Sequence, residues 1–503
     1  MHLNKDQVYV LNPDYVLRND IHRIALYAKE SVNAYSSRNW NSFIHPIHAK
    51  LFSFFTYDRT LGENIGLISS FFKKDVESVS RLVIPYLENP TPIYVNWKGK
   101  RILFPKNILV QKKHLTTPFT PSRLMKVDFD CQEIDLDTRR FYSGPLMITF
   151  MLNNTCVTRC VYCYADVQTK VQHLVPVYRW LELIQEAKLM QVRQINLMGG
   201  EIFLYKDWDI LLKELVDQGM SPEYLSTKIP LTEDLIVRLQ NTGYTNCLQI
   251  SLDAYDVDIL CSSLQVNADY LERVEKGLRL LDESGITYHV ATVLYSCNGR
   301  EEELRKLFDF LITLSHLSDW RISPAVNSIM IDYDIFSKIK LKRFQIEMLF
   351  RYVNNVLSSQ SPFPILLNRT AIDKSYYTCL IDSKEFKGAV CSALNTHLFV
   401  LPDGKVSICE QLYWNPLFIT GDVNASSLKE IWMSDKNLQL AYIQRENIQE
   451  SSPCRYCKLF DLCFSNRNRC WADIIKAYGK NNWDYPDPRC EKAYKMRNNL
   501  DYE

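Results

Sequence analysis

Three cysteines stand within eight residues, shortly after an apolar stretch that has the length of a strand. They are Cys156, Cys160 and Cys163, and their spacing is CxxxCxxC. Thiolates spaced in this way on one loop can each reach a different corner of a cubic iron–sulfur cluster, which normally takes four cysteines. One iron is then left open for another ligand. Structural zinc and chance clustering are the alternatives, although the next cysteine is Cys247 and the nearest downstream histidine is His173.

Strand-like and helix-like stretches alternate around this triad. The apolar run 146–152 predicts a buried strand before it, an amphipathic stretch covers 177–189, and a second strand, 194–198, runs into Gly-Gly-Glu. Further strand-like runs lie at 224–228, 247–252, 288–295 and 320–322, and helix-like segments lie at 208–217, 233–240, 268–282 and 302–314. This alternation predicts an α/β fold with about six strand–helix units, whose open positions lie at the carboxyl ends of the strands.

The triad, followed one helix and one strand later by Gly-Gly-Glu, resembles that of the radical S-adenosylmethionine (SAM) enzymes. The resemblance implies a partial (β/α)6 barrel and a [4Fe-4S] cluster whose open iron chelates the amino and carboxylate groups of SAM. The glycines let the backbone approach a bound group, and the glutamate is an acceptor for an ammonium. The implied SAM-binding residues are Tyr162 beside the adenine, Gly199, Gly200 and Glu201 at the amino group, and Ser251 and Asp253 at the ribose. Alone, Gly-Gly-Glu is a common turn, and Ser251 and Asp253 could instead cap the next turn.

A second cysteine pattern fills the C-terminal quarter of the chain. It resembles the seven-cysteine SPASM extension of peptide-modifying radical SAM enzymes, which implies two auxiliary [4Fe-4S] clusters. By correspondence, the ligands of one cluster are Cys391, Cys409 and Cys470 together with the upstream Cys379. Those of the other are Cys454, Cys457, Cys463 and Cys490. Six residues separate Cys463 from Cys470, whereas the family usually has three, and this departure bears on Cys470. A zinc ribbon beginning at Cys454 is the alternative.

Glu410 directly follows one of these cysteines. In sulfatase-maturing relatives, an Asp at the corresponding place is the proposed base that removes a proton from the substrate radical. The resemblance therefore implies a catalytic role for the Glu410 carboxylate. A solvated surface glutamate is the alternative.

The first 90 residues predict a small α+β module that is winged-helix-like. Short strands flank Asn12-Pro13-Asp14, Thr60 to Glu63 has the form of a capping box, and Asp75 can cap a further helix. This order resembles the recognition element of ribosomal-peptide maturases, which binds the leader of a precursor peptide by adding its backbone as an edge strand. A module for nucleic acid or dimerisation is the alternative, but a net charge of +1 gives no electrostatic argument for nucleic acid.

The chain therefore divides into four predicted parts: residues 1–90, the recognition module; 91–145, a bridging segment; 146–365, the barrel; and 366–503, the SPASM extension. With 47% apolar and 23% charged residues, such a chain can bury a sizeable core. The density of thiols favours a reducing compartment, and the sequence has neither an evident signal segment nor a long apolar span. We expect a cytoplasmic protein with no membrane partner.

Together, these resemblances imply an oxidoreductase of ribosomal-peptide biosynthesis. Its SAM would be cleaved reductively to a 5'-deoxyadenosyl radical, which removes a hydrogen atom from a residue of a precursor peptide, with a crosslink, a thioether or epimerisation as the outcome. The expected electron donor is a flavodoxin or ferredoxin. The alternatives are a maturase of a folded protein such as a sulfatase and a non-catalytic, cluster-bearing partner that binds peptide. The precursor, the modified residue and the oligomeric state do not follow from the sequence.

Overall fold

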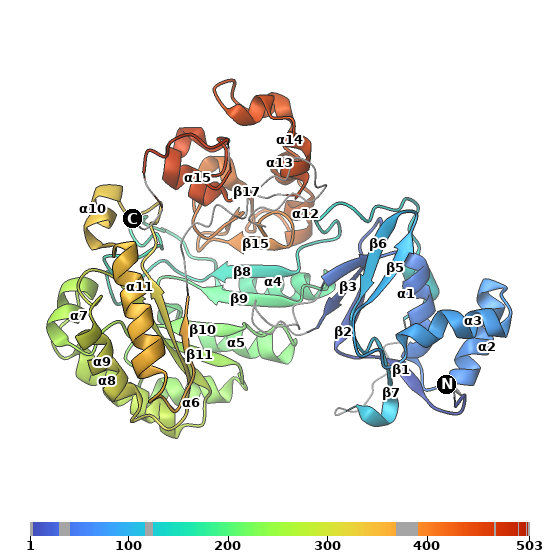
Figure 1. Ribbon diagram of the computed structural model, residues 1–503, viewed down its shortest axis with the longest axis horizontal. Coiled ribbons are helices and arrows are strands. Elements are labelled where there is room, and N and C mark those ends of the chain that lie inside the picture. The colour runs from blue at the N-terminus through green and yellow to red at the C-terminus, as the bar shows by residue number, and fades with distance from the viewer. Residues whose placement is uncertain are drawn as a thin grey trace. The chain divides into compact units, whose positions relative to one another are not determined.

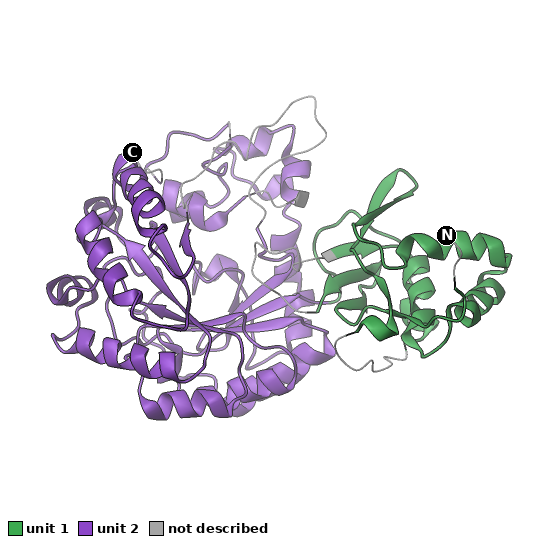
Figure 2. Ribbon diagram, turned by 60° about the horizontal axis from the view of Figure 1, so that its bottom comes forward, with its two compact units in different colours: residues 1–143 green, residues 144–503 purple. Residues whose placement is uncertain are grey.

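The computed structural model describes residues 4–29, 41–115, 124–368, 391–466, 469–490, 492–498 and 500. The chain forms two compact units, residues 1–143 and 144–503, and each has its own hydrophobic core (Figures 1 and 2). Residues 91–143 thus belong to the same unit as the N-terminal module. The finer boundaries at 90 and 365 stay predictions.

Unit 1 combines short antiparallel sheets with three helices. Its strands form a three-stranded sheet and two strand pairs: β2 (Tyr15–Asn19), β3 (Ile24–Ala28) and β4 (Asn41–Ile44); β1 (Tyr9–Leu11) with β7 (Leu109–Gln111); and β5 (Ile93–Trp97) with β6 (Lys100–Phe104). The helices are α1 (Pro46–Phe52), α2 (Leu61–Phe72) and α3 (Val76–Val83). The predicted α+β character of the module is therefore confirmed, although β1 pairs with β7 and not with β2.

Two predicted helix starts in unit 1 have the expected geometry. Thr60 accepts a hydrogen bond from the backbone N–H of Glu63 at 3.2 Å, and the Glu63 carboxylate accepts one from the Thr60 N–H at 2.7 Å. Asp75 accepts from the Ser78 N–H at 2.8 Å. These bonds satisfy donors that a helix leaves unpaired at its first turn, so α2 and α3 begin where the sequence places them.

Parallel strands and outer helices build the first two thirds of unit 2 (Figure 2). The strands are β8 (Met147–Met151), β9 (Gln194–Met198), β10 (Tyr224–Thr227), β11 (Cys247–Ser251), β12 (Tyr288–Leu294), β13 (Leu317–Pro324) and β14 (Ile365–Leu367). The helices are α4 (Val177–Leu189), α5 (Trp208–Asp217), α6 (Glu233–Asn241), α7 (Val257–Leu264), α8 (Tyr270–Glu283), α9 (Glu301–Leu311), α10 (Tyr333–Ile339) and α11 (Arg343–Tyr352). The predicted α/β barrel is confirmed, whereas α7 was not expected.

The cysteine-rich region continues the barrel wall. Its strands are β15 (His397–Val400), β16 (Lys405–Ser407) and β17 (Ile419–Asp422), and its helices are α12 (Leu428–Met433), α13 (Asp435–Ala441), α14 (Phe460–Asn466) and α15 (Trp471–Tyr478). β15 pairs in parallel with β8, so one sheet runs in the order β17-β16-β15-β8-β9 (Figure 1). The strand that leads to the cysteine triad is thus held directly by the cysteine-rich region.

The two faces of the barrel strands differ in polarity. Leu225, Leu248 and Trp320 are fully buried, and Trp320 contacts Phe308 of the outer helix α9. Alternate residues on the opposite face are accessible, including Tyr224, Ser226, Gln249, Ser251 and Arg321. Branched apolar side chains usually fill a closed parallel barrel, so this accessible and largely polar inner face indicates an open interior.

No helix in the described part of the chain is both long enough and apolar enough to span a membrane.

Candidate active site

The cysteine triad lies on a loop that begins after β8. Thr158, which is buried, brings two of the thiols together: its Oγ1 lies 3.4 Å from Cys156 Sγ and 3.2 Å from Cys160 Sγ. The backbone N–H of Cys163 donates to the Cys160 carbonyl at 3.0 Å. All three cysteines are partly accessible. The loop therefore leaves its three cysteine residues partly accessible, as ligands of an added group require.

The end of α7 holds this loop in place. Arg159 N–H donates to the Leu264 carbonyl at 2.8 Å, and Val161 N–H donates to the Ser263 carbonyl at 2.9 Å. The helix that sequence reasoning missed thus anchors the segment between the first and third cysteines.

The Gly-Gly-Glu turn packs against the backbone just before the triad. Gly200 N–H donates to the Asn153 carbonyl at 3.1 Å, and Glu201 N–H donates to the Thr155 carbonyl at 2.7 Å. A Cβ on Gly200 would lie 2.2 Å from the Thr155 oxygen, and one on Gly199 would lie 2.9 Å from the Asn153 oxygen. Only glycine allows this close approach, which ties the end of β9 to the cysteine loop.

The Glu201 carboxylate bonds to donors of the chain itself. It accepts hydrogen bonds from Thr227 Oγ1 at 2.9 Å, from Lys228 N–H at 3.0 Å and from Phe203 N–H at 3.3 Å. The side chain is 2% exposed, and burial raises its pKa although these hydrogen bonds oppose the increase. In this structure Glu201 anchors the end of β10; its contact with the SAM ammonium stays a prediction.

Tyr162, Lys228 and Asp253 form one polar network at the carboxyl ends of the strands. Lys228 Nζ donates to Asp253 Oδ2 at 2.7 Å and to the Tyr162 hydroxyl at 3.0 Å, and the Tyr162 hydroxyl also donates to Asp253 Oδ2. The other carboxylate oxygen accepts from Val293 N–H at 2.9 Å. The Tyr162 ring lies 5.2 Å from that of Tyr295. Two predicted SAM-binding residues thus meet through Lys228, which sequence reasoning missed.

Asp253 does not cap the next turn, which was the alternative role for Ser251 and Asp253. The cap of α7 is Asp256, whose carboxylate accepts from Ile259 N–H at 3.1 Å, whereas Asp253 bonds to Val293 on the neighbouring strand β12. Ser251 ends β11 and is partly exposed on the inner face. Both residues therefore lie at the carboxyl end of β11, and Asp253 contacts Tyr162 of the cysteine loop.

The electrostatics of this site fit a thiolate-bound group. Burial raises the pKa of Cys160, and the Lys228 charge opposes the increase. Burial also raises the pKa of Cys163 to about 11, again against the Lys228 charge. The three partly accessible thiols are ligands that suit an iron–sulfur cluster with one open iron. The nearby Lys228 cation and the closely packed Gly-Gly turn complete the surroundings of this site.

Within the described residues, electrostatic interactions link members of each predicted set of auxiliary ligands. The charge of Cys391 acts on both Cys409 and Cys470. The charges of Cys454, Cys457 and Cys490 act on Cys463. Cys379 lies outside the described residues. The unusual spacing before Cys470 therefore does not separate it from its predicted partner Cys391, and the two ligand sets stay predictions.

Burial dominates the pKa values in the first of these sets, raising those of Cys409 and Cys470 well above the usual value. Such thiols are poor ligands until a metal displaces their protons, because the thiolate is the form that binds. Among the described residues, no group of three or more His, Cys, Asp and Glu side chains is arranged to hold a single metal ion.

Glu410 is partly buried, and burial raises its pKa. Burial likewise raises the pKa values of Tyr164 and Tyr224, and the Glu410 charge raises both further. These two tyrosines are 39% and 44% exposed. Partial burial distinguishes Glu410 from a fully solvated surface carboxylate.

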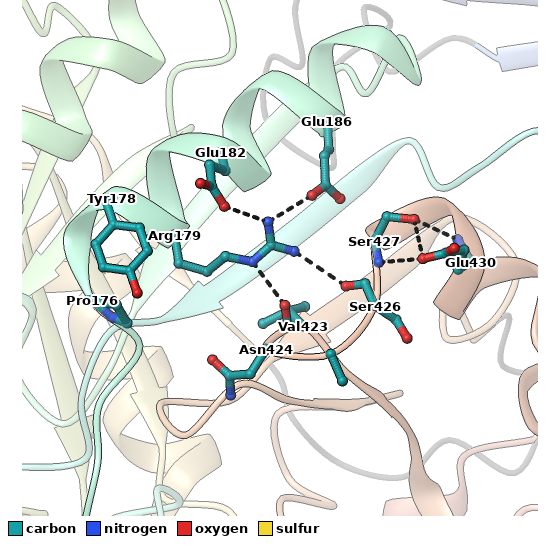
Figure 3. A pocket seen from close by; sticks show the side chains of 11 residues that line it. Pro176, Tyr178, Arg179, Glu182, Glu186, Val423, Asn424, Ser426, Ser427 and Glu430 are labelled. Atoms are coloured by element: carbon teal, nitrogen blue, oxygen red, sulfur yellow. Dashed lines mark hydrogen bonds and ion pairs between the residues drawn. The ribbon is translucent and has the colours of Figure 1, made fainter.

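A polar cleft of about 570 Å³ marks where α4 meets the segment before α12 (Figure 3). Arg179 spans it: Nε donates to the Val423 carbonyl at 2.9 Å, and a terminal nitrogen donates to the Ser426 carbonyl at 3.3 Å. The same guanidinium pairs with Glu182 at 2.8 Å and with Glu186 at 2.9 Å. The Arg179 guanidinium thus connects α4, the helix that follows the triad, to the cysteine-rich region.

Comparisons with known proteins agree with this geometry. The sequence model of the radical SAM superfamily matches residues 151–311, and that of the SPASM iron–sulfur cluster-binding domain matches residues 391–458. The PqqA peptide cyclase of Granulibacter bethesdensis is 24% identical over 155 residues, which are 31% of this chain and 41% of the cyclase. Mycofactocin maturase MftC of Mycolicibacterium smegmatis is 19% identical over 367 residues, 71% of this chain and 85% of the relative.

The fold has a counterpart among solved structures. Streptococcus suis SuiB bound to S-adenosylmethionine aligns with a TM-score of 0.60 at 17% identity, and the alignment covers 96% of this chain and all of SuiB. The radical SAM domain implies a [4Fe-4S] cluster and SAM, and the SPASM domain implies auxiliary iron–sulfur clusters. The chain therefore contains a radical SAM domain at residues 151–311 and a SPASM domain at residues 391–458.

Proposed function

We propose that this protein is a radical SAM enzyme that modifies a residue of a ribosomally made precursor peptide. The observation that carries the proposal is the cysteine triad beside the Tyr162–Lys228–Asp253 network. Electrostatic interactions among the SPASM cysteines support it. The relatives support a peptide substrate, since one is named a peptide cyclase and the other a mycofactocin maturase. SuiB has been solved bound to its precursor peptide SuiA.

Bound SAM and a reduced cluster would supply a 5'-deoxyadenosyl radical, which is the cofactor's chemistry rather than the protein's. The residues of the chain bind and orient these groups. Cys156, Cys160 and Cys163 would hold the cluster, while Tyr162 and Asp253 would line the adenosine side at the strand ends. The Gly200 backbone keeps the loop at a fixed distance from β9.

The barrel interior is the proposed place for the peptide residue that reacts. Tyr164 and Tyr224 offer ring surface there, and Arg321, which is paired with Asp319 at 2.7 Å, offers a charged group. The Glu410 charge acts on both tyrosines, which supports the proposal that its carboxylate takes a proton from a substrate in this space. The lining favours a polar or aromatic segment of the core peptide.

Unit 1 is the proposed site for the leader. Its sheet β2-β3-β4 has two outer strands, and an extended peptide can add to such an edge through backbone hydrogen bonds. On α3, Val76 is 46% exposed and Leu82 is 57% exposed. Apolar side chains left accessible on one short helix are typical of a surface that a partner covers.

The auxiliary clusters complete the proposal. We infer two [4Fe-4S] clusters, on the Cys379/Cys391/Cys409/Cys470 and Cys454/Cys457/Cys463/Cys490 sets, which take an electron from the substrate radical. A flavodoxin or ferredoxin supplies the first electron. Because the ligands must be thiolates, this assembly suits the reducing cytoplasm.

Co-expression of the full chain with a short peptide encoded beside its gene tests the proposal. We expect a mass change in the peptide that is lost with Cys160→Ala, because that substitution removes a cluster ligand. A Leu82→Asp variant should lower modification of the peptide but leave SAM cleavage without peptide unchanged. A Cys160→Ala protein that still supports full modification would favour the non-catalytic partner, and an active enzyme that modifies only a folded protein would favour a sulfatase-type maturase.

A further inference from the structure

The ammonium of Lys228 lies at the centre of the strand-end network. It bonds to Asp253 Oδ2 and to the Tyr162 hydroxyl, and the side chains of Lys228 and Asp253 are 15% and 0% exposed. Removing two charges from water costs free energy that their mutual attraction only partly returns. A buried ion pair beside an accessible binding site is therefore weak evidence for stability and calls for a functional explanation.

The backbone of Lys228 is fixed on both sides. Its N–H donates to Glu201 Oε2 at 3.0 Å, and its carbonyl accepts from the Tyr270 hydroxyl at 2.7 Å. Asp253 is held separately through Val293 N–H. The charge of Lys228 thus has a defined position, set by β9, β10 and α8, instead of following a mobile surface side chain.

The ammonium of Lys228 lies beside the cysteine loop. Its Nζ donates to the Tyr162 hydroxyl at 3.0 Å and lies 5.6 Å from the centre of the Tyr162 ring, and Tyr162 stands between the second and third cysteines of the triad. Asp253 Oδ2 accepts from the same hydroxyl, so the anion of the pair also contacts the loop. The Lys228 charge acts on both Cys160 and Cys163. A buried cation in a fixed position therefore lies beside two of the predicted cluster ligands.

We propose that Lys228 is a positioning residue whose buried positive charge makes the cluster on Cys156, Cys160 and Cys163 easier to reduce. Reduction adds one electron to a group that already carries the negative charge of three thiolates. Net charge and burial set the potentials of iron–sulfur clusters, so a fixed cation nearby stabilises the reduced form. Asp253 orients the ammonium and partly offsets its effect. This inference rests on the cluster assignment in the proposed function but not on the peptide substrate.

The test is a potentiometric titration of the full-length, reconstituted protein without peptide, followed by electron paramagnetic resonance. The signal that changes when SAM is added identifies the cluster of the triad. Lys228→Met should lower the ratio of reduced to oxidised cluster at a fixed potential by about tenfold, or about 59 mV for a one-electron couple. Asp253→Asn should raise the ratio, because it leaves the cation without its counter-charge.

Lys228→Arg keeps the charge and should hold the ratio within about threefold of wild type, as expected for one charge at a similar distance. Lys213→Met is the matched control, because that lysine is 58% exposed on α5 and pairs with Asp217 on the surface. It should leave the ratio unchanged. Opposite shifts for Lys228→Met and Asp253→Asn support an electrostatic role, since damage to the fold would shift both in the same direction.

Shifts of the same sign in these two variants, or an unchanged ratio in Lys228→Met, would overturn the inference. If Lys228→Met fails to take up the cluster, Asp253→Asn decides: an unchanged or lower ratio overturns the charge effect. Iron content and SAM cleavage in the wild-type protein test the cluster assignment separately. A failed assignment is therefore distinguishable from a failed role for Lys228.

Discussion

Gly200 offers a sharp test of how the site is built, because its missing Cβ faces the backbone that leads to the first cysteine. In Gly200→Ala the new Cβ would lie 2.2 Å from the Thr155 oxygen, and Cβ contacts under 3.0 Å essentially do not occur. The Thr155 carbonyl or the β9 end must therefore move by at least 0.8 Å, the difference between these two distances. Cys156 is the next residue, so the movement reaches a predicted cluster ligand directly.

The cost follows from two terms. Overpacking of a tightly packed site costs about 1–3 kcal/mol, and loss of the hydrogen bond from Glu201 N–H to the Thr155 carbonyl costs about 1 kcal/mol. Stability should thus fall by about 2–4 kcal/mol, and a displacement near 1 Å at a catalytic group can lower a rate by about 100-fold. We expect the variant to lose about four of roughly 12 irons, the share of one cluster in three.

Iron analysis, thermal unfolding and 5'-deoxyadenosine formation measure these effects. Gly66→Ala is the control, because a Cβ there meets nothing within 4 Å and α2 should gain about 0.5–1 kcal/mol. Gly199→Ala, with its closest contact at 2.9 Å, should be milder than Gly200→Ala. A Gly200→Ala protein with full iron content and wild-type SAM cleavage would refute the argument.

Three further variants test other parts of the structure. Arg179→Ala removes the hydrogen bonds across the cleft of Figure 3 and should lower the free energy of unfolding by about 1–3 kcal/mol, measured by thermal unfolding. Arg179→Lys lacks the guanidinium that forms these bonds and should recover only part of the loss. An Arg179→Ala protein as stable as wild type would show that these bonds do not stabilise the structure. Glu410→Gln should lower formation of the modified peptide by about 100-fold or more but spare SAM cleavage, and equal product yields by mass spectrometry would exclude it as base. Burial lowers the pKa of His397 from 6.5 to about 3. Between pH 6.5 and pH 3 the unfolded chain therefore binds a proton that the folded chain does not. The free energy of unfolding should fall by about 2 kcal/mol from neutral pH to pH 5. His397→Gln, which can still bond to Thr149, should flatten this pH dependence in denaturant unfolding, and an unchanged slope would show that the proton binds elsewhere.

The local parts of the fold followed closely from the sequence. Helix 177–189 and strand 194–198 have the predicted bounds, because each has a clear apolar period and ends at a distinct signal. The capping box at Thr60 and the helix cap at Asp75 likewise depend on neighbouring residues. The strand pairings that could not be predicted join segments far apart in the sequence. β1 pairs with β7 about 100 residues later, and β15 pairs with β8 although the other barrel strands lie between them in the sequence.

The site divides in the same way. Cysteine spacing is a local pattern and indicated the triad, and the resemblance to the SPASM extension implied the two auxiliary ligand sets. Lys228 has no motif, and its role becomes visible only when β10 lies beside β11. The surroundings of Glu410 could not be predicted either. Its charge acts on Tyr164 and Tyr224, and these three residues come from three separate segments of the chain. Helix α7 escaped prediction because its eight residues are too few to display a clear period.

The most direct test of the central claim is anaerobic. The full chain is reconstituted with iron and sulfide, reduced with dithionite, and given SAM, while iron per chain and 5'-deoxyadenosine are measured. The account predicts deoxyadenosine from a protein with roughly 12 irons, the total of three four-iron clusters. A fully loaded and reduced protein that forms no deoxyadenosine, even with candidate precursor peptide present, would contradict it.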